Sequence, residues 1–404
     1  MERRVTEKEE LEIIKRGVEE IIPEEELKNK LTMAKQLGKP LRVKYGIDPT
    51  ASDVHIGHLV PIRKMRELQD LGHIGVIIIG DFTAQIGDPT GRDTSRPPLT
   101  AEQVKKNAER YMEQLYTVLD RDKTEIRWQS EWFSGMTLID VIKLLSKFTL
   151  AQFMCHETFR TRYEKGLPLA MHEIMYPVLQ AYDSVAIEAD IEFGATEQKF
   201  NILCGRDMQR YFDMEQQVAM LFPILTGTDG VNKMSKSLNN YIAVLDSPND
   251  KYGKIMSIPD DLIMQYFKLA TTVGEEELAE IERELAAGKN PKYIKQRLAR
   301  NIVSFFHGEQ QGEEAEKEFE KVFSQRDIPA DLPVYECKNS PIWIVKLLTE
   351  SKLCKSSGEA RRMIKQKAVT VNSRKVEEES ENIEIDDEVL VKVGKRRFLK
   401  VKKG

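Results

Sequence analysis

The chain of 404 residues is long enough for two or three domains, and its 41% hydrophobic and 31% charged residues are typical of a globular protein. It has no apolar run as long as a membrane span, no apolar centre of a secretion signal and no paired cysteine spacing, so we expect a cytoplasmic protein without a membrane partner, a disulfide framework or a zinc site. The net charge of −5 is unevenly distributed, because residues 341–404 carry 16 Lys and Arg against 10 Asp and Glu, which favours a nucleic-acid partner about equally with a solvated charged surface.

The first part of the chain alternates between strand and helix patterns. Residues 42–48 and 75–81 read as buried strands, and residues 56–71 between them carry apolar side chains at helical spacing. This order predicts a right-handed crossover unit of a parallel sheet. Further helical stretches (101–121, 137–148 and 171–182) and the short apolar runs TEIRW, ADIEFG and FPILTG continue the alternation. We therefore expect one α/β domain over residues 1–245.

The pattern changes in the second part of the chain. Residues 246–325 are charge-rich and follow a helical period throughout, which predicts a separate helical domain. Prolines cluster and the helical period fails in residues 326–340, which indicates a linker. Residues 341–404 contain two short amphipathic helical stretches followed by alternating strand-like runs, which predicts a small α+β domain.

Two histidines flank a glycine where the first predicted strand passes into the first predicted helix. In an open parallel sheet, ligands bind beyond the carboxyl ends of the strands, and the N-terminus of the following helix attracts phosphate. Gly57 leaves room for a purine or ribose against the backbone, while His55 and His58 can donate hydrogen bonds to phosphate oxygens. Taken alone, this HIGH stretch is also compatible with histidines that cap a helix.

A polar loop follows the last of these apolar runs. Its stretch KMSKS contains Lys233, Ser235 and Lys236, and two lysines that close over a triphosphate can neutralise charge as pyrophosphate departs. Alone, it could be an exposed basic loop. In this order and on this fold, HIGH and KMSKS resemble the paired signatures of the class I aminoacyl-tRNA synthetases, which implies a Rossmann-like catalytic domain.

The choice of amino acid depends on another helix. Tyr176, Gln180 and Asp183 are spaced i, i+4 and i+7, hence on one face, and they are expensive to bury unless a ligand hydrogen-bonds them. They resemble the tyrosine-specific members of the family, in which the Tyr and Gln bind the α-amino group and the Asp receives the phenol hydroxyl. Tryptophan-specific relatives rank second. An Asp in this role discriminates strongly against phenylalanine, which would leave the buried carboxylate unpaired.

The resemblance implies further site residues around ATP and tyrosine. It brings Asp48 and Thr50 to the ATP phosphates and ribose, Asp88 to the α-amino group, and Arg92 and Arg96 to pyrophosphate.

Three positions depart from the family pattern. Glu197, followed by Gln198 in the tyrosine and ribose stretch, stands where many members have an Asp that holds the ribose. Lys44, which we expect among the tyrosine-binding residues, stands where many have a Tyr that touches the substrate hydroxyl. Tyr45 is one residue on and faces the other way, so the sequence leaves open which of the two reaches the pocket. Arg92 stands where a Lys is common.

The family resemblance also implies a mechanism and partners. The carboxylate of tyrosine attacks the α-phosphorus of ATP, Thr50 and His55 contact the leaving phosphates, Lys233 and Lys236 close over them, and Mg²⁺ bound with ATP shares the charge without a dedicated protein site. Tyrosine then passes to the 3′-terminal adenosine of tRNA. Family members are dimers, so we expect a homodimer, with residues 148–166 as the candidate interface.

The last 64 residues resemble a small RNA-binding domain first described in a ribosomal protein. In it, Arg361, Arg362, Lys365 and Lys367 would face tRNA phosphates and supply salt-dependent affinity. The helical domain and this tail would hold the anticodon and the long variable arm.

Two other readings remain at this point. A different nucleotidyltransferase could use the histidine turn, but it would not need the KMSKS loop, the Tyr/Gln/Asp helix or the basic tail. An RNA-binding protein on a decayed synthetase frame predicts lost histidines or lysines, and all of them are present.

Overall fold

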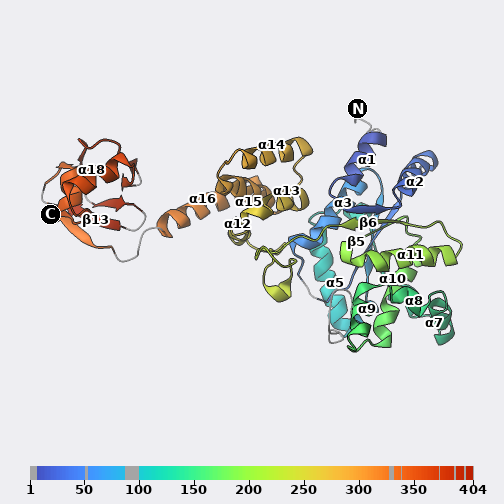
Figure 1. The fold of residues 1–404 in the computed structure, drawn as a ribbon. Helices are drawn as coiled ribbons and strands as arrows, with labels where there is room; N and C mark the ends of the chain where they lie inside the picture. Colours follow the sequence, from blue (N-terminus) through green and yellow to red (C-terminus); the bar gives the residue numbers. More distant parts are fainter. Residues whose placement is uncertain are drawn as a thin grey trace. The chain divides into compact units, whose positions relative to one another are not determined.

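The computed structural model describes residues 7–50, 53–86, 100–326, 332–337, 339–372, 374–385, 388–394 and 397–403. The chain divides into two compact units, Met1–Glu316 and Lys317–Gly404. Figure 1 shows the elements of each unit along the chain.

The first unit is built on a six-stranded sheet with the order β1-β6-β5-β2-β3-β4. Its strands are β1 (Glu20–Ile22), β2 (Arg42–Ile47), β3 (Ile74–Ile79), β4 (Thr124–Trp128), β5 (Ile191–Ala195) and β6 (Val218–Phe222). All neighbours pair in parallel except β1, which runs antiparallel to β6. The predicted parallel α/β sheet is confirmed, whereas β1 was not predicted, since three residues are too few to show a period of two.

Helices connect and cover these strands. The helices of the sheet region are α1 (Glu7–Lys15), α2 (Glu24–Leu37), α3 (Leu59–Asp70), α4 (Thr83–Ile86), α5 (Ala101–Leu115), α6 (Ser130–Phe133), α7 (Leu138–Leu145), α8 (Leu150–Phe153), α9 (Glu157–Glu164), α10 (Met171–Ala186) and α11 (Lys199–Tyr211). In Figure 1, α10 and α11 pack together beside β5 and β6. The chain runs outward from β2 to β4 and then returns to β5 on the other side of β2, so the strand order reverses between β2 and β5. Such a reversal opens a crevice at the carboxyl ends of the strands.

Burial explains most of the strand predictions and one error. All five residues of β6 are buried, as are the last five of β3, which matches the apolar runs expected of a parallel sheet covered on both faces. The run FPILTG was predicted as a strand, but only its first residue, Phe222, belongs to β6, which begins at Val218. Pro223 follows directly, and a proline has no backbone N–H to donate to a sheet.

Five helices follow the sheet region: α12 (Pro248–Met256), α13 (Ile263–Ala270), α14 (Glu275–Ala286), α15 (Pro291–His307) and α16 (Glu309–Arg326). Helix α12 begins with a cap, because the Ser247 hydroxyl accepts from the Asp250 backbone N–H at 3.2 Å and Pro248 occupies the first turn. The helical character predicted for residues 246–325 is confirmed.

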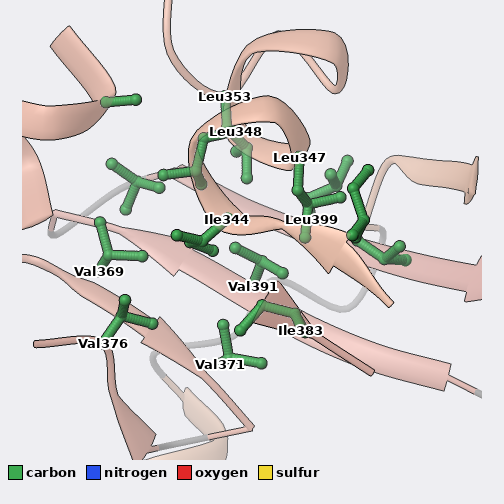
Figure 2. Close-up of a cluster of buried hydrophobic side chains, with 14 of the residues drawn as sticks. Ile344, Leu347, Leu348, Leu353, Val369, Val371, Val376, Ile383, Val391 and Leu399 are labelled. Atoms are coloured by element: carbon green, nitrogen blue, oxygen red, sulfur yellow. The ribbon is translucent and has the colours of Figure 1, made fainter. Parts of the chain in front are cut away.

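The second unit is a small α+β fold. It contains α17 (Ile344–Glu350), α18 (Ser357–Lys365) and the strands β7 (Val334–Cys337), β8 (Ile342–Trp343), β9 (Val369–Val371), β10 (Arg374–Lys375), β11 (Asn382–Ile383), β12 (Glu388–Val393) and β13 (Arg397–Lys403). Leucine, isoleucine and valine side chains from both helices and the sheet form its core (Figure 2). Strand β7 lies in the predicted linker and pairs in parallel with β13, so the folded unit begins before residue 341.

Within the described ranges, no helix is long and apolar enough to cross a bilayer.

Candidate active site

A cavity of about 330 Å³ lies at the carboxyl ends of β2 and β5, where the strand order reverses. Nine of the residues singled out in the sequence line it: Asp48, Thr50, His58, Tyr176, Gln180, Asp183, Glu197, Gln198 and Lys233. They come from five separate stretches of the chain, so the fold brings together residues that the sequence only suggested were related.

Helix α10 supplies one wall of the cavity. Tyr176, Gln180 and Asp183 all line it, as their helical spacing predicts. The start of the helix is anchored by Glu173, whose carboxylate receives two hydrogen bonds of 3.0 Å from the buried guanidinium of Arg162 on α9 and one from the Ala170 backbone N–H. A bidentate buried pair of this kind fixes the direction in which the helix enters the site.

The carboxyl group of Asp183 is buried, because the residue is only 2% exposed. Gln129 Nε2 donates to one oxygen at 2.8 Å, and Trp132 Nε1 donates to the other at 3.1 Å. Burial raises the pKa of Asp183 to about 7, although Lys44 and the Gln129 hydrogen bond act in the opposite direction. Such a carboxylate has unused lone pairs, and a hydroxyl donor in the cavity would satisfy one of them.

Asp48 holds the Tyr176 side chain of α10 in place. Its carboxylate accepts from the Tyr176 hydroxyl at 2.8 Å and from Thr83 Oγ1 at 2.7 Å. Thr83 in turn donates its backbone N–H to Gln129 Oε1 at 3.0 Å. A side chain at Gly80 would meet Asp48 and Thr83 within 2.3 Å, so only glycine fits at the end of β3. A continuous hydrogen-bonded chain thus joins Tyr176 to Asp183 along the cavity.

The two histidines form one stacked unit at the start of α3. Their ring centroids lie 3.5 Å apart, and the His58 backbone N–H donates to the His55 carbonyl at 2.9 Å. Burial, with a smaller effect of Lys236, lowers the pKa of His55 to about 4, and burial also holds the pKa of His58 well below its usual range. Nδ1 of His55 is buried and has no hydrogen-bond partner among the described residues. Both imidazoles are therefore neutral near pH 7 and act through single N–H donors.

Backbone pairing brings the HIGH segment to the chain that follows the KMSKS loop. The Ile56 backbone N–H donates to the Ile242 carbonyl at 3.0 Å, and the Val244 N–H donates to the Val54 carbonyl at 2.9 Å. Lys251 of α12 is fully buried and donates to the carbonyls of Ala243 and Val244 at 3.1 and 2.8 Å. The first helix after the sheet region therefore braces the pairing between the two motifs.

Hydrogen bonds to neighbouring segments fix the backbone of the KMSKS loop. Buried Met234 donates its backbone N–H to the Leu225 carbonyl at 2.9 Å, and Asn240 Oδ1 accepts from the Ser235 backbone N–H at 2.8 Å. Lys233 and Lys236 form ion pairs with Glu197 at 2.8 Å and with Asp53 at 3.5 Å. Because these pairs are partly exposed, they are weak and can be exchanged for phosphate oxygens.

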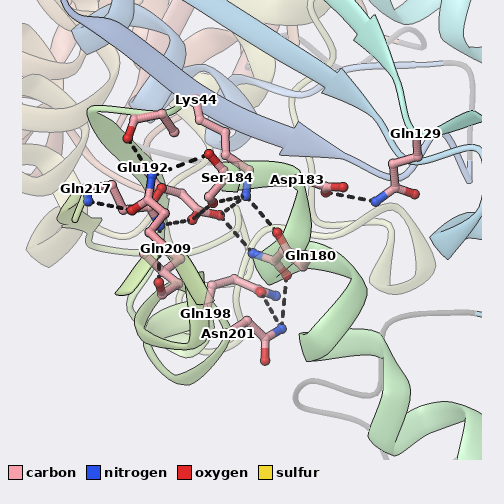
Figure 3. A network of polar contacts seen from close by, with 12 residues as sticks. Lys44, Gln129, Gln180, Asp183, Ser184, Glu192, Gln198, Asn201, Gln209 and Gln217 are labelled. Carbon is pink, nitrogen blue, oxygen red and sulfur yellow. Dashed lines mark hydrogen bonds and ion pairs between the residues drawn. The ribbon is translucent and has the colours of Figure 1, made fainter. Parts of the chain in front are cut away.

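The prediction for Lys44 needs correction. We expected Lys44 among the tyrosine-binding residues, but it is fully buried, does not line the cavity and pairs with Glu192 at 2.9 Å (Figure 3). Tyr45 lines the cavity instead. Adjacent residues of a strand face opposite sides of the sheet, and the side that Lys44 faces is covered by α10.

Several predicted residues lie beside the cavity or outside the description. His55, Gly57, Ser235 and Lys236 flank its lining rather than forming it. Asp88, Arg92 and Arg96, which were predicted from the family resemblance, lie outside the described ranges.

The basic residues of the second unit lie on α18 and just after it. Arg361, Arg362, Lys365 and Lys367 are all exposed. Glu379 lies 3.7 Å from Arg361 and 3.4 Å from Lys365, and Glu377 lies 3.5 Å from Lys367. These exposed ion pairs leave the cations accessible to solvent.

Some residues that line the cavity were not predicted from the sequence. Gln129 and Thr83 both line the cavity, and Gln129 follows β4 directly. A polar residue just after a parallel strand was an available signal for Gln129. Tyr111 of α5 also lines the cavity, but its helical periodicity gives no hint of a site.

In the part of the chain that the structure describes, no group of three or more His, Cys, Asp or Glu is arranged to hold a metal ion.

Comparison with known proteins gives one consistent family. A model described as tRNA synthetases class I (W and Y) matches residues 35–324, and a model described as the tyrosine–tRNA ligase SYY-like C-terminal domain matches residues 324–401. Among curated relatives, the tyrosine–tRNA ligase of Carboxydothermus hydrogenoformans is 48% identical and that of Thermotoga maritima 46% identical. The first match covers 98% of both chains, and the second covers 99% of both.

Solved structures agree in fold. The tyrosyl-tRNA synthetase of Archaeoglobus fulgidus, complexed with L-tyrosine, superposes with a TM-score of 0.63 at 22% identity over 77% of this chain and 100% of that one. A truncated mitochondrial tyrosyl-tRNA synthetase of Aspergillus nidulans gives 0.64 at 19% identity over 80% and 95%. From the family models and the near full-length relatives together, the chain belongs to the class I tRNA synthetases of the W and Y type, and within them to the tyrosine–tRNA ligase family.

Proposed function

We propose that the cavity activates L-tyrosine with ATP, giving tyrosyl-adenylate and pyrophosphate, and that the tyrosyl group then passes to the 3′-terminal adenosine of tRNA(Tyr). A single observation carries the proposal: one cavity is lined by an acceptor for a hydroxyl (Asp183), polar groups for an ammonium (Tyr176 and Gln180) and groups for phosphates (His58 and Lys233).

The amino acid lies along α10 in this proposal. Its phenol hydroxyl donates to Asp183, and its ammonium donates to the oxygens of Gln180 and Tyr176. Gln198 lies beside Gln180, because Asn201 Nδ2 donates to the side-chain oxygens of both, at 3.2 and 3.0 Å. The ends of tyrosine are thereby fixed, and its carboxylate is left facing the ATP side of the cavity.

The chemical step needs no general base, since the carboxylate of tyrosine is already ionised. It attacks the α-phosphorus, a new C–O–P bond forms, and the bond to the pyrophosphate oxygen breaks. Thr50, His55 and His58 donate to the phosphate oxygens as negative charge moves onto the leaving group. Neutral imidazoles suit this role, because they supply directed N–H donors.

The KMSKS loop acts on the leaving group. When ATP binds, Lys233 exchanges Glu197 for phosphate, and Lys236 exchanges Asp53 in the same way. Ser235 helps to close the loop, and Gly57 lets the nucleotide lie against the backbone. The freed Glu197 carboxylate is then available to the ribose hydroxyls, while Asp48 reaches the nucleotide from the end of β2.

Mg²⁺ belongs to the bound ATP in this proposal. The Asp48 carboxylate, directly after β2, accepts hydrogen bonds from the Tyr176 hydroxyl and from Thr83 Oγ1. The ATP phosphates would hold the ion, which would share the charge of the departing pyrophosphate. By the family resemblance, Asp88 adds a contact with the amino group, and Arg92 and Arg96 add contacts with pyrophosphate.

Binding of tRNA uses the rest of the chain. We assign residues 1–245 to catalysis, residues 246–325 to the anticodon, and residues 341–404, together with the strand β7 that pairs with β13, to RNA backbone contacts. Arg361, Arg362, Lys365 and Lys367 contact phosphates, so affinity falls with salt.

A homodimer completes the assembly, and a cytoplasmic location fits the substrates. Helices α7 to α9 and the start of α10 support a self-interface, because large apolar side chains are exposed there. Leu138, Ile139 and Ile142 of α7, Leu150 of α8, Tyr163 of α9, Leu167 and Met171 are between 41% and 76% exposed. Exposed apolar clusters of this kind mark protein interfaces.

The test is ATP–pyrophosphate exchange with Mg²⁺ and each of the twenty amino acids in separate reactions. The proposal expects exchange with tyrosine, followed by charging of tRNA(Tyr). Exchange with tryptophan alone would contradict the assignment of α10, and no exchange with any amino acid would contradict the proposed chemistry.

A further inference from the structure

A buried ion pair lies directly beneath the amino-acid end of the cavity. Lys44 and Glu192 are register partners in the neighbouring parallel strands β2 and β5, so their side chains leave the sheet on the same face. Their charged atoms are 2.9 Å apart, and the two side chains are 0% and 1% exposed. Burying two charges costs desolvation free energy that offsets most of their attraction. The net stability that the pair contributes is therefore small and does not by itself explain its presence.

The pair contacts one substrate-facing residue at two points. Glu192 Oε1 accepts from Gln180 Nε2 at 3.1 Å, and Lys44 Nζ donates to the Gln180 backbone carbonyl at 2.9 Å. Lys44 also donates to Ser184 Oγ at 2.8 Å, one turn further along α10. Figure 3 shows these bonds converging on Gln180 from the side of the sheet.

These contacts determine which end of the Gln180 amide faces the cavity. An ionised carboxylate only accepts, so Glu192 holds the NH₂ end of Gln180 on its own side. The oxygen then points away from Glu192, where Asn201 Nδ2 donates to it at 3.2 Å. An amide turned the other way would present donors to an ammonium, and two donors cannot hydrogen-bond.

The surroundings of Glu192 are built to keep it in place. Gln217 Nε2 and Ser184 Oγ both donate to its other oxygen, the latter at 3.2 Å. A Cβ atom at Gly205 of α11 would lie 2.5 Å from Gln217 Nε2 and 3.0 Å from Glu192 Oε2. Only glycine leaves room for this network.

We propose that Lys44 and Glu192 are positioning residues for amino-acid recognition: their ion pair orients Gln180 so that its side-chain oxygen receives the ammonium of the substrate. The inference rests on the proposed function, because it assigns Gln180 to the α-amino group. It also gives Lys44 a role in recognition without contact with the substrate.

The main variant is Lys44→Met/Glu192→Leu, which removes both charges and leaves no unpaired buried ion. A second variant, Gly205→Ala, disturbs the network while keeping both charges. A matched control is Lys64→Met, which removes another buried lysine of the same unit, one that pairs with Glu67 away from the cavity. Thermal unfolding establishes that each variant is folded.

The readout compares L-tyrosine with 3-(4-hydroxyphenyl)propionate, which lacks only the amino group. Calorimetry measures the binding of both ligands, and exchange measures the KM for tyrosine and the inhibition constant of the analogue. We expect the double variant to lose about ten- to hundredfold in tyrosine affinity, the effect of one hydrogen bond to a charged group. The analogue affinity and the KM for ATP should stay at wild-type values, and Lys64→Met should change neither ligand.

Three outcomes would overturn the inference: unchanged tyrosine affinity in the double variant, an equal loss for tyrosine and the analogue, or an equal loss in the Lys64→Met control. Wild-type protein without tyrosine-dependent exchange would instead contradict the proposed function, so the two failures are distinguishable.

Discussion

Asp183 combines burial with a charge that recognition requires, and this combination predicts a measurable cost in stability. Desolvation raises its pKa from an ordinary value of 3.8 to about 7. A rise of about three pH units corresponds to about 4 kcal/mol against the ionised form. In the unfolded chain the group ionises near its ordinary pKa, so the folded protein binds more protons between pH 4 and 7 and loses stability as the pH rises through that range.

The perturbation is Asp183→Asn, which resembles the protonated carboxyl and does not titrate. Relative to wild type, we expect the variant to be stabilised by about 2 kcal/mol at pH 5 and about 4 kcal/mol at pH 8. The difference between these two values corresponds to about 4 to 8 °C in Tm for a domain of this size. The variant should also recognise tyrosine less well, because the amide oxygen accepts the phenol hydrogen bond less strongly than a carboxylate. The preference for tyrosine over phenylalanine should therefore fall.

The assay is thermal unfolding of both proteins at several pH values between 5 and 8 and at one protein concentration. Asp213→Asn is the control, because Asp213 is exposed, and its Tm should follow wild type at every pH. If the Tm difference between Asp183→Asn and wild type does not change with pH, the carboxylate is not strained in the folded protein and the reasoning fails. The KM for tyrosine in wild type should also fall as the pH rises from 6 to 8, when Asp183 ionises.

Three further predictions concern the loop, the interface and the tail. Lys233→Ala should lower kcat for exchange by about 10²- to 10³-fold with little change in the KM for tyrosine, since it removes a charge that acts on the leaving group; a large change in that KM alone would contradict this role. Leu138→Glu should give a monomer in analytical ultracentrifugation, because it puts a charge into the exposed apolar cluster, and an intact dimer would exclude α7 from the interface. Replacing Arg361 and Lys365 together with alanine should weaken tRNA binding and reduce the slope of log K against log salt by roughly 2, with unchanged pyrophosphate exchange; an unchanged slope would show that neither contacts phosphate.

Much of the site could be predicted because its residues follow a simple geometric rule. Helical spacing put Tyr176, Gln180 and Asp183 on one face, and the structure has all three lining one cavity. The histidines lie at the carboxyl end of a parallel strand, where such sheets bind ligands.

The wrong predictions concern features that only tertiary contacts determine. Lys44 and Tyr45 alternate across β2, but only the contacts of Lys44 with α10 and Glu192 determine that Lys44 is buried while Tyr45 lines the cavity. Glu192 lies in an apolar run that was predicted as a strand. Nothing in the sequence indicates that its charge pairs with Lys44, 148 residues away. The run FPILTG shows that apolar character does not distinguish the end of a strand from the loop that follows it.

The most direct test of the central claim is a crystal structure of the protein with a non-hydrolysable tyrosyl-adenylate analogue. The account predicts the phenol oxygen within hydrogen-bonding distance of Asp183, the ammonium on Gln180 Oε1 and the Tyr176 hydroxyl, and the adenosine against Gly57 and His58. An analogue bound with its phenol away from Asp183, or with its ammonium facing the NH₂ end of Gln180, would contradict it.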